Sequence, residues 1–351
     1  MKELWKGNEA MAEAAVRAGM ELYVGYPITP QSEIVEYLSA RMPELGRVFI
    51  QSESEVISIN ALLGGSVTGA RCMTSSTGVG ISLMQEGLTA IFNKGLASVV
   101  IDVNRSGCGM GNNFSGGQDD YLRSTRGGGN GDYRLLVYIP NTIQEAINLV
   151  YNAWEVGEKY RNPVMILTEG RLGQMMEAVE LPEFKEIRRQ EWGLDGTTKV
   201  MKDYGPMQPE NTAKYRARLL LMEENEQKWE MYRTEDAEIV IVAVGLCSRV
   251  CMGAVDELRE QGIRAGVLRP ISAWPFPVHG FEELPDSVSR LICVEVGNYG
   301  QVIQDVLIAA KKVKKLNTVP VYNYYEYELM NSDAVSSYVK EAIAGNQKEV
   351  Q

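Results

Sequence analysis

Short apolar runs alternate with amphipathic stretches through the first half of the chain. Six short and mostly apolar runs have the length of β-strands, and they cover residues 22–24, 48–50, 70–74, 98–103, 135–139 and 164–167. The stretches between them have helical spacing, as in Ile34, Val35 and Leu38. Alternating strands and helices are typical of a parallel sheet with helices on both faces. We therefore predict an α/β fold.

The pattern changes in the second half of the chain. Residues 180–235 are charged and lack strand period, although residues 211–229 favour a helix that crosses the first domain. Further strands are predicted at 239–245, 265–268 and 291–294, before a final helix capped by Ser332. The predicted organisation is a first domain at 1–180, a linker at 181–235 and a second α/β domain at 236–351.

Three further helix starts are predicted from residue type. Asn8 has the side chain of an N-cap, and Thr29 followed by Pro30 fits an N-cap and the first helical position. Thr142 and Glu145 have the spacing of a capping box, in which each side chain accepts a hydrogen bond from the other's backbone N–H. We expect helices to begin at these three places.

The carboxyl ends of four predicted strands carry polar loops. Ligands of open parallel sheets lie beyond these ends, so we expect the loops to form one site. Its candidate residues are Thr29, Glu55 and Arg105. Each has a structural alternative. Glu55 has capping-box spacing from Ser52, Thr29 can be only an N-cap, and Arg105 can pair with one of three nearby aspartates, Asp102, Asp119 or Asp120.

A long glycine-rich segment, residues 104–133, follows the fourth of these strands. Its glycine clusters at 107–111 and 127–131 do not form G-x-G-x-x-G between a strand and a helix, and the chain has no G-x-x-x-x-G-K-[ST] motif. A nucleotide site is therefore not predicted. Loops of this length inside a domain are often functional, and we expect this one to close over a substrate, with a flexible surface loop as the alternative.

Composition and charge exclude several function classes. The net charge of −11 argues against nucleic acid as a partner, because phosphate binding needs clustered Lys and Arg. A single histidine, His279, cannot complete a Ser-His-Asp triad or an H-E-x-x-H zinc site. The five cysteines form no C-x-x-C pair, so we predict no metal site here and expect any iron–sulfur cluster on another chain. No run is long enough to span a membrane and the N-terminus lacks a signal-peptide core, which predicts a cytoplasmic protein.

Several motifs together resemble one family. They are GYPITP at 25–30, QSESE at 51–55, MTSS at 73–76, SLMQEG at 82–87, GGGNGDYR at 127–134, YRNPV at 160–164, LRPI at 268–271 and WPFP at 274–277. The combination covers nearly the whole chain and resembles the alpha-type subunit of 2-oxoacid:ferredoxin oxidoreductases. The glycine run and GQMM at 173–176 look most like the 2-oxoisovalerate, branched-chain type. TGVG at 77–80 and RSGCG at 105–109 differ from the commoner family forms, which bears on substrate preference more than on chemistry.

The resemblance implies a fold and a set of site residues. It implies a pyrimidine-type thiamine diphosphate domain followed by a transketolase-C-terminal-like domain. Glu55 falls on the acid that hydrogen-bonds the aminopyrimidine and stabilises its imino tautomer, and Glu53 in the same turn fits the family's spacing less well. Tyr26 and Thr29 fall beside the cofactor, and Thr29 and Arg105 fall near the carboxylate of the 2-oxoacid.

The resemblance also implies partners. The Gly-Asp-Gly motif that holds Mg²⁺ and the diphosphate is missing, and LDG at 194–196 is not a match. Mg²⁺ and the [4Fe-4S] clusters are therefore expected on beta-type, gamma-type and ferredoxin-like subunits, with ferredoxin as electron acceptor. The implied reaction converts a branched-chain 2-oxoacid and CoA to acyl-CoA and CO₂. Pyruvate, 2-oxoglutarate or an aryl-2-oxoacid as substrate, and a non-catalytic structural subunit, are the alternatives.

Overall fold

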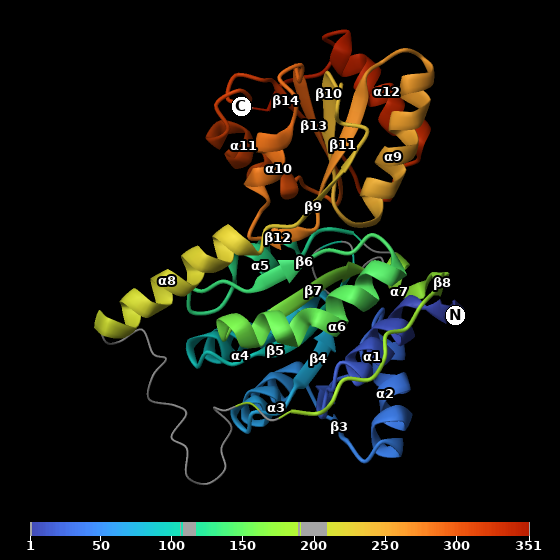
Figure 1. Cartoon of the computed structure of the whole chain (residues 1–351). Coiled ribbons are helices and arrows are strands. Elements are labelled where there is room, and N and C mark those ends of the chain that lie inside the picture. Colours follow the sequence, from blue (N-terminus) through green and yellow to red (C-terminus); the bar gives the residue numbers. More distant parts are fainter. Residues whose placement is uncertain (1, 106, 108–116, 189, 191–208, 351) are drawn as a thin grey trace.

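Seven strands form the first sheet of the computed structural model, which describes residues 2–105, 107, 117–188, 190 and 209–350 (Figure 1). In the spatial order β12-β6-β7-β5-β4-β2-β3 the strands are Ser272–Trp274, Leu136–Tyr138, Val164–Glu169, Ser98–Asn104, Cys72–Ser76, Leu22–Gly25 and Val48–Gln51. All neighbours are parallel except β12, which is antiparallel to β6. The predicted parallel sheet is confirmed, and β12 is an addition to it.

Helices pack against this sheet in two groups. One group contains α1, α2 and α6, and the other contains α3 and α4. The helix bounds are α1 Gly7–Arg17, α2 Ser32–Glu44, α3 Glu55–Val67, α4 Gly78–Asn93, α5 Tyr121–Arg126, α6 Ile143–Tyr160 and α7 Gly170–Gln174. All seven residues of the central strand β5 are buried, as expected for a parallel strand covered by helices.

The second sheet has the order β14-β13-β10-β11-β9. Its strands are Val321–Glu326, Arg290–Val296, Ile239–Val242, Ala265–Pro270 and Trp229–Tyr232, and only β9 is antiparallel. Figure 1 shows α9 (Gly245–Glu260) and α12 (Ser332–Ile343) on one side of it and α10 (Val278–Glu283) and α11 (Val302–Lys312) on the other. A separate helix, α8 (Pro209–Asn225), packs on the first domain, where Met222 is buried in the core and Arg218 Nη1 donates to the Arg161 carbonyl at 2.8 Å.

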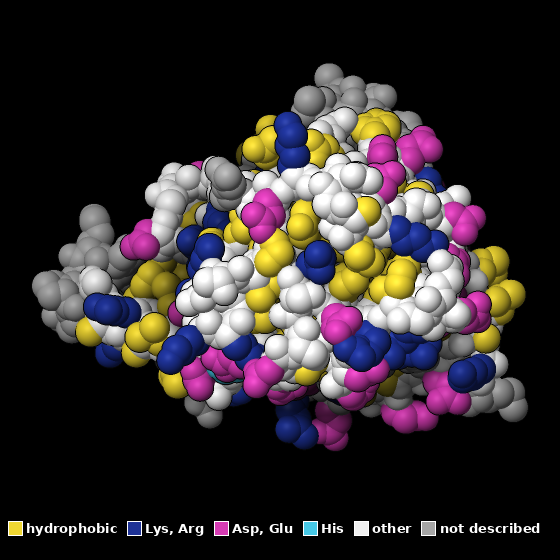
Figure 2. Space-filling model, turned by 90° about the horizontal axis from the view of Figure 1, so that it is seen from above, with side chains coloured by type: hydrophobic (Ala, Val, Ile, Leu, Met, Phe, Trp, Pro, Cys, Tyr) yellow, Lys and Arg dark blue, Asp and Glu magenta, His cyan; other side chains and the backbone are white. Residues whose placement is uncertain are grey.

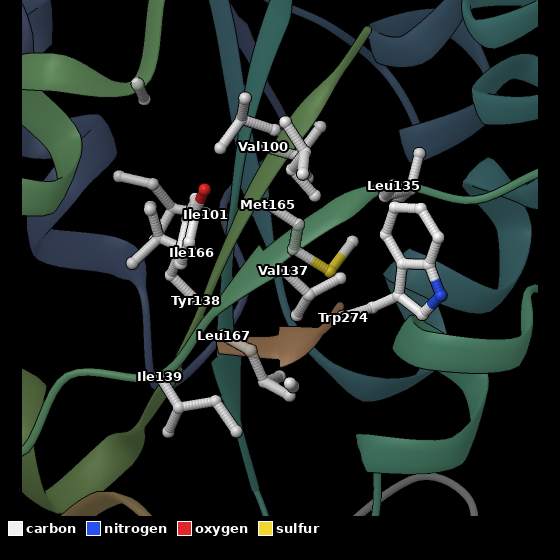
Figure 3. Packing of buried hydrophobic residues seen from close by; sticks show 14 of the residues in the cluster. Val100, Ile101, Leu135, Val137, Tyr138, Ile139, Met165, Ile166, Leu167 and Trp274 are labelled. Carbon is white, nitrogen blue, oxygen red and sulfur yellow. The ribbon is translucent and has the colours of Figure 1, made fainter. Parts of the chain in front are cut away.

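The core of the first domain extends to residues of the second. In Figure 3, Ile101 and Ile166 lie on one side of the sheet, while Val137 and Met165 lie on the other with Trp274. Trp274 belongs to β12, which comes from the later part of the chain. Burial of a side chain of this size stabilises the junction of the two domains through the hydrophobic effect.

Two polar side chains also join the domains. The Gln118 amide nitrogen Nε2 donates to the Val244 carbonyl at 3.0 Å, and its Oε1 accepts from the Val296 N–H at 3.1 Å. Glu169 Oε1, at the end of β7, accepts from the Leu246 N–H at 3.0 Å. Such hydrogen bonds stabilise the junction of the two domains, because a buried polar group that loses its partner costs free energy.

Some local predictions are wrong. Lys6, not Asn8, precedes α1, and Asn8 lies inside that helix with its Nδ2 donating to the Pro30 carbonyl at 2.8 Å. Thr29 does not cap a helix, because α2 begins at Ser32 with Gln31 at the N-cap. The final helix is capped by Asn331, one residue before Ser332. The capping interaction of Thr142 with the Glu145 N–H is confirmed at 3.1 Å.

Four short strands were not predicted besides β12. They are β1 (Glu3–Lys6), β8 (Met176–Val179), β9 and β14, and most of them are partly exposed. Strands β1 and β8 pair with each other in a separate two-stranded sheet. The predicted linker, 181–235, contains both α8, which was expected, and β9, which belongs to the second sheet. The domain boundaries themselves stay a prediction.

The surface carries charges of both signs. On the face shown in Figure 2, Lys and Arg side chains are interspersed with Asp and Glu. Across the part of the chain that the structure describes, no helix combines the length and apolar character needed to span a bilayer.

Candidate functional site

The ends of β5, β4, β2 and β3 lie at one edge of the first sheet, because these strands are neighbours in that order. Ser76 is the last residue of β4, Arg105 and Thr29 lie in the loops after β5 and β2, and Glu55 begins the helix that follows β3. The Ser52 N–H donates to the Gly25 carbonyl at 2.9 Å, which holds the turn before Glu55 against the end of β2. The predicted convergence of four polar loops is thus present in the structure.

Glu55 is the first residue of α3. Its side chain is only 5% exposed. Among the described residues, no side chain or backbone amide donates a hydrogen bond to its carboxylate, whereas the N-cap Ser54 accepts from the Ile57 N–H at 3.4 Å. Ser52 is bonded instead to the Ser58 hydroxyl at 2.5 Å and to the Ser54 carbonyl at 3.1 Å. The capping-box alternative for Glu55 is therefore wrong, because the cap is Ser54.

The glycine at position 80 makes room for the Glu55 carboxylate. A Cβ atom on Gly80 would lie 2.6 Å from Glu55 Oε1 and 2.0 Å from the Ser76 hydroxyl. Both side chains therefore contact the first turn of α4. The hydroxyls of Ser76 and Thr77 are buried and have no hydrogen-bond partner within the described ranges. Buried polar groups without partners are costly, and at a site edge they are suited to a ligand.

Arg105 connects the end of β5 with the end of β2. Its Nη1 donates to the Thr29 carbonyl at 3.0 Å, and the side chain is buried. Gly78 lies beside it, since a Cβ there would be 3.7 Å from Arg105 Nε. The Thr29 side chain is exposed. Thr29 and Arg105 thus lie together next to the turn that leads from Ser76 to Gly80.

The aspartates considered as partners of Arg105 have other contacts. Arg123 Nη2 lies 2.6 Å from Asp120 Oδ1 and 3.8 Å from Asp102 Oδ2. Asp119 Oδ2 accepts from the Gly107 N–H at 2.6 Å. The guanidinium that faces Asp102 and Asp120 therefore belongs to Arg123.

A buried network supports the loop that carries Tyr26 and Thr29. The Ser75 hydroxyl donates to Gln31 Oε1 at 2.6 Å and lies 2.7 Å from the Tyr23 hydroxyl, while Gln31 Nε2 donates to the Tyr26 carbonyl at 2.9 Å. Burial raises the pKa of the Tyr23 phenol above its ordinary value. Tyr26, whose side chain is half-buried, is the first residue of this loop, and these hydrogen bonds hold the loop in place.

The glycine run at 127–131 packs on α4. The Gly128 N–H donates to Gln85 Oε1 at 2.8 Å, and a Cβ on Gly129 would lie 2.0 Å from the Thr89 hydroxyl. Close packing therefore explains Gly128 and Gly129, whereas Gly131 has a positive φ of 80° and no neighbour within 4 Å of a Cβ. Residues 106 and 108–116, on which the predicted closing loop partly falls, lie outside the described residues.

Sequence reasoning gave no site role of their own to four contributors to this edge. They are Ser76 and Gly80, which it named only within motifs, and Asp102 and Asp120, which it named only as possible partners of Arg105. A detectable signal existed for Asp102, since it is a carboxylate inside an otherwise apolar strand. The contribution of Gly80 depends on a contact with Glu55 across two helices, and no local pattern encodes such a contact.

Comparison with known proteins gives two family matches. Residues 13–244 match the family described as pyruvate flavodoxin/ferredoxin oxidoreductase, thiamine diphosphate-binding, and residues 237–330 match pyruvate:ferredoxin oxidoreductase core domain II. The chain is 41% identical over 321 residues to ketoisovalerate oxidoreductase subunit VorB of Methanothermobacter marburgensis, covering 88% of this chain and 90% of that protein. It is 32% identical over 346 residues to 2-oxoglutarate synthase subunit KorA of Methanocaldococcus jannaschii, covering 90% and 93%.

Solved structures share the fold. A 2-oxoglutarate:ferredoxin oxidoreductase from Magnetococcus marinus, with 2-oxoglutarate, coenzyme A and succinyl-CoA bound, superposes with a TM-score of 0.85 at 23% identity, covering 97% of this chain and 65% of that chain. A split-gene transketolase in an inactive beta4 tetramer gives a TM-score of 0.62 at 15% identity, covering 97% and 98%. The two-domain α/β architecture therefore recurs in structures with little sequence identity.

Proposed function

The chain belongs to the pyruvate flavodoxin/ferredoxin oxidoreductase family, and from that premise we propose that it is the pyrimidine-binding subunit of a branched-chain 2-oxoacid:ferredoxin oxidoreductase. The family assignment confirms the predicted alpha-type resemblance, the thiamine diphosphate-binding domain and the oxidoreductase class. The roles of individual residues, the identity of the 2-oxoacid and the nature of each partner subunit are parts of the proposal.

The observation that carries the proposal is the unpartnered Glu55 carboxylate. It is buried at the site edge and no described residue donates a hydrogen bond to it. A buried carboxylate without a donor is unfavourable by itself, so a ligand that donates a hydrogen bond there is stabilising. The ring nitrogen of an aminopyrimidine, when protonated, is such a donor. Glu55 is therefore assigned to that nitrogen, with Tyr26 beside the ring.

The residues at this edge fit half of a thiamine diphosphate site. When bound, thiamine diphosphate supplies the nucleophilic carbon and the electron sink for decarboxylation. Glu55 holds a proton at the pyrimidine nitrogen, the buried side chains around Ser76 exclude water, and Arg105 provides charge-assisted hydrogen bonds for the carboxylate of the 2-oxoacid. The Gly78-to-Gly80 backbone leaves the space in which these groups meet.

Exposed apolar side chains around Glu55 support a partner at this edge. Val56 is 45% exposed, Ile57 is 46% exposed and Leu83 on α4 is 53% exposed. Strand β3 is the edge of its sheet, and Val48 and Ile50 on it are also exposed. Apolar patches beside a binding site mark protein interfaces. We assign this patch to a beta-type subunit that binds Mg²⁺ and the diphosphate, with [4Fe-4S] clusters on the gamma-type and ferredoxin-like subunits.

A branched-chain substrate is favoured over 2-oxoglutarate by relative similarity. The protein at 41% identity carries the ketoisovalerate name, whereas the 2-oxoglutarate synthase subunit is at 32%. A test of the whole proposal is anaerobic purification of the native complex, identification of its chains, and assay of ferredoxin reduction with CoA and a panel of 2-oxoacids. We expect the highest kcat/KM with 2-oxoisovalerate. Preference for 2-oxoglutarate, pyruvate or an aryl-2-oxoacid contradicts the substrate assignment.

The role of Arg105 has a separate test in the same complex. Arg105→Ala should raise the KM for the 2-oxoacid by an amount equivalent to about 2–4 kcal/mol, because a charge-assisted pair to the carboxylate is lost. Arg105→Lys keeps the charge but not the planar guanidinium, so its KM should lie between those of the wild type and Arg105→Ala. Cofactor content should stay unchanged in both variants. A KM equal to that of the wild type in Arg105→Ala would show that the residue only braces the Thr29 loop.

A further inference from the structure

Asp102 and Asp120 form a buried pair of carboxyl groups behind Arg105. Asp102 lies on β5, in register with Ser76 of β4, and both of its oxygens are buried without a hydrogen bond from any described residue. Asp120 lies just before α5 and is also buried. The pair has no part in the function proposed above. Asp102 nevertheless lies on the strand that ends just before Arg105.

A single backbone bond connects this pair to the site. Asp120 Oδ2 accepts from the Gly78 N–H at 3.1 Å. Gly78 has a positive φ of 25°, and a Cβ on it would be in van der Waals contact with Arg105, at 3.7 Å from Nε. A change in the position of Asp120 therefore moves the chain that packs against the Arg105 guanidinium.

We propose that Asp120, paired with Asp102, is a positioning residue that fixes the Gly78 turn against Arg105 and so sets the affinity for the 2-oxoacid carboxylate. The inference rests on the proposed role of Arg105. Asp120 acts through Gly78 and contacts no substrate. Asp102 supports Asp120 by sharing a proton with it.

The local charges favour one shared proton. Arg123 from α5 faces both carboxyls, Asp119 lies next to Asp120 in the chain, and Arg105 lies beyond Gly78. Burial, and then the nearby Asp120 charge, hold the pKa of Asp102 well above its ordinary value. Burial also raises the pKa of Asp120, against the lowering effect of Arg123. One proton on the pair leaves a single negative charge opposite the single positive charge of Arg123.

The proposal predicts a pH dependence of substrate affinity. When the shared proton is lost at alkaline pH, the two carboxylates repel each other and the Gly78 contact is disturbed. We therefore expect the KM of the wild-type complex for the 2-oxoacid to rise with pH. Asp102→Asn should remove this rise, because the amide donates to Asp120 at every pH. Asp120→Ala, which lacks the acceptor for the Gly78 N–H, should raise KM roughly tenfold at neutral pH with cofactor content unchanged.

A matched control separates this role from general stability. Asp305 on α11 is another buried carboxylate with an arginine partner, Arg126 at 2.6 Å, and it accepts from the Tyr121 hydroxyl at 2.8 Å. Asp305→Asn should lower the melting temperature but leave the KM–pH profile of the wild type intact. If Asp305→Asn also removes the rise of KM with pH, destabilising α5 is sufficient to cause this change, and the proposal is wrong.

A second readout needs no activity. In the isolated chain, the infrared difference spectrum between the wild type and Asp102→Asn should contain the band of a buried protonated carboxyl, and the difference spectrum between the wild type and Asp305→Asn should not. An unchanged band in Asp102→Asn contradicts the shared proton. A wild-type complex that oxidises no 2-oxoacid overturns the proposed function together with this role. An active complex in which Arg105→Ala raises KM while Asp120→Ala does not overturns only the present inference.

Discussion

Two buried glutamates of this chain differ in how their carboxylates are satisfied. Glu55 begins α3, and Glu169 ends β7 and contacts the first turn of α9; each side chain is 5% exposed. Glu169 accepts a hydrogen bond from the Leu246 N–H, whereas Glu55 has no such donor among the described residues. The exposed fraction of the two side chains is therefore the same, and the missing partner distinguishes the candidate site residue from the structural one.

A glycine contacts each of these carboxylates. Gly80 leaves space for Glu55, and Gly245, with a φ of 58°, leaves space for Glu169. The Glu169 contact connects the two domains, so that its energy contributes to their docking. The contact between Gly80 and Glu55 lies instead at the site edge, next to the exposed apolar patch. The two environments should respond differently to the same substitutions.

Replacing Glu55 should have the largest effect on turnover. Glu55→Gln keeps shape and hydrogen-bonding capacity but cannot share a proton, so we expect kcat of the reconstituted complex to fall roughly 10²-fold or more. Assembly and melting temperature should not change. Glu169→Gln in the same complex is the matched control and should keep kcat near the wild-type value. Equal losses of kcat in both variants would remove the distinction between the two glutamates.

Glu169 should instead affect stability as a function of pH. Burial raises its pKa from 4.5 to about 7. A raised pKa in the folded state means that its contribution to stability is full below pH 4.5 and is lost as the pH rises through 7. The free energy of unfolding of the wild type should therefore fall by about 3 kcal/mol relative to Glu169→Gln across this window. Parallel pH profiles in denaturant titrations of the two proteins would contradict this.

Substitutions of the two glycines should have different effects, on the stability of the fold for Gly245 and on cofactor binding for Gly80. Gly245→Ala places a Cβ 2.0 Å from Glu169 Oε1 at a positive φ, so we expect it to destabilise the fold by about 1–3 kcal/mol. Gly80→Ala would displace Glu55 or Ser76, and its main effect should be weaker thiamine diphosphate binding by the complex. Melting curves and cofactor titrations of both variants measure these two effects. Weaker thiamine diphosphate binding in Gly245→Ala but not in Gly80→Ala would contradict the assignment of Glu55 to the site and of Glu169 to the scaffold.

The smallest expected effect concerns the helix cap next to Glu55. Ser54→Ala removes the acceptor of the Ile57 N–H and should cost about 0.5–1 kcal/mol of stability. Glu55→Gln should cost less, because Glu55 does not cap the helix. Chemical denaturation of the isolated chain compares the two directly. A larger loss in Glu55→Gln than in Ser54→Ala would show that the charge of Glu55 stabilises the fold, and the residue would then be structural.

The positions of most strands along the chain, the parallel sheet and the converging loops were predictable because they depend on local pattern. Apolar runs such as Ser98–Asn104 identify buried parallel strands, and the family resemblance assigned the chain correctly. The start of α2 was misplaced because Thr29 and Pro30 have the right residue types for a helix start but lie in a turn before it. Strand β12 was missed because three residues give no period, and its pairing with β6 depends on tertiary packing.

The site was predictable only in part for a similar reason. Glu55 and Arg105 stand out as charged residues after apolar strands. The absence of a donor at Glu55, and the contact of Gly78 with Arg105, are properties of packed neighbours that no spacing encodes.

The most direct test of the central claim is the exchange rate of the C2 proton of thiamine diphosphate bound to the reconstituted complex. If Glu55 shares a proton with the pyrimidine ring, Glu55→Gln should slow this exchange by roughly 10²-fold or more while the amount of bound cofactor stays close to that of the wild type. Exchange at the wild-type rate in Glu55→Gln would show that Glu55 does not serve the cofactor, and the assignment of this edge as half of a thiamine diphosphate site would be wrong.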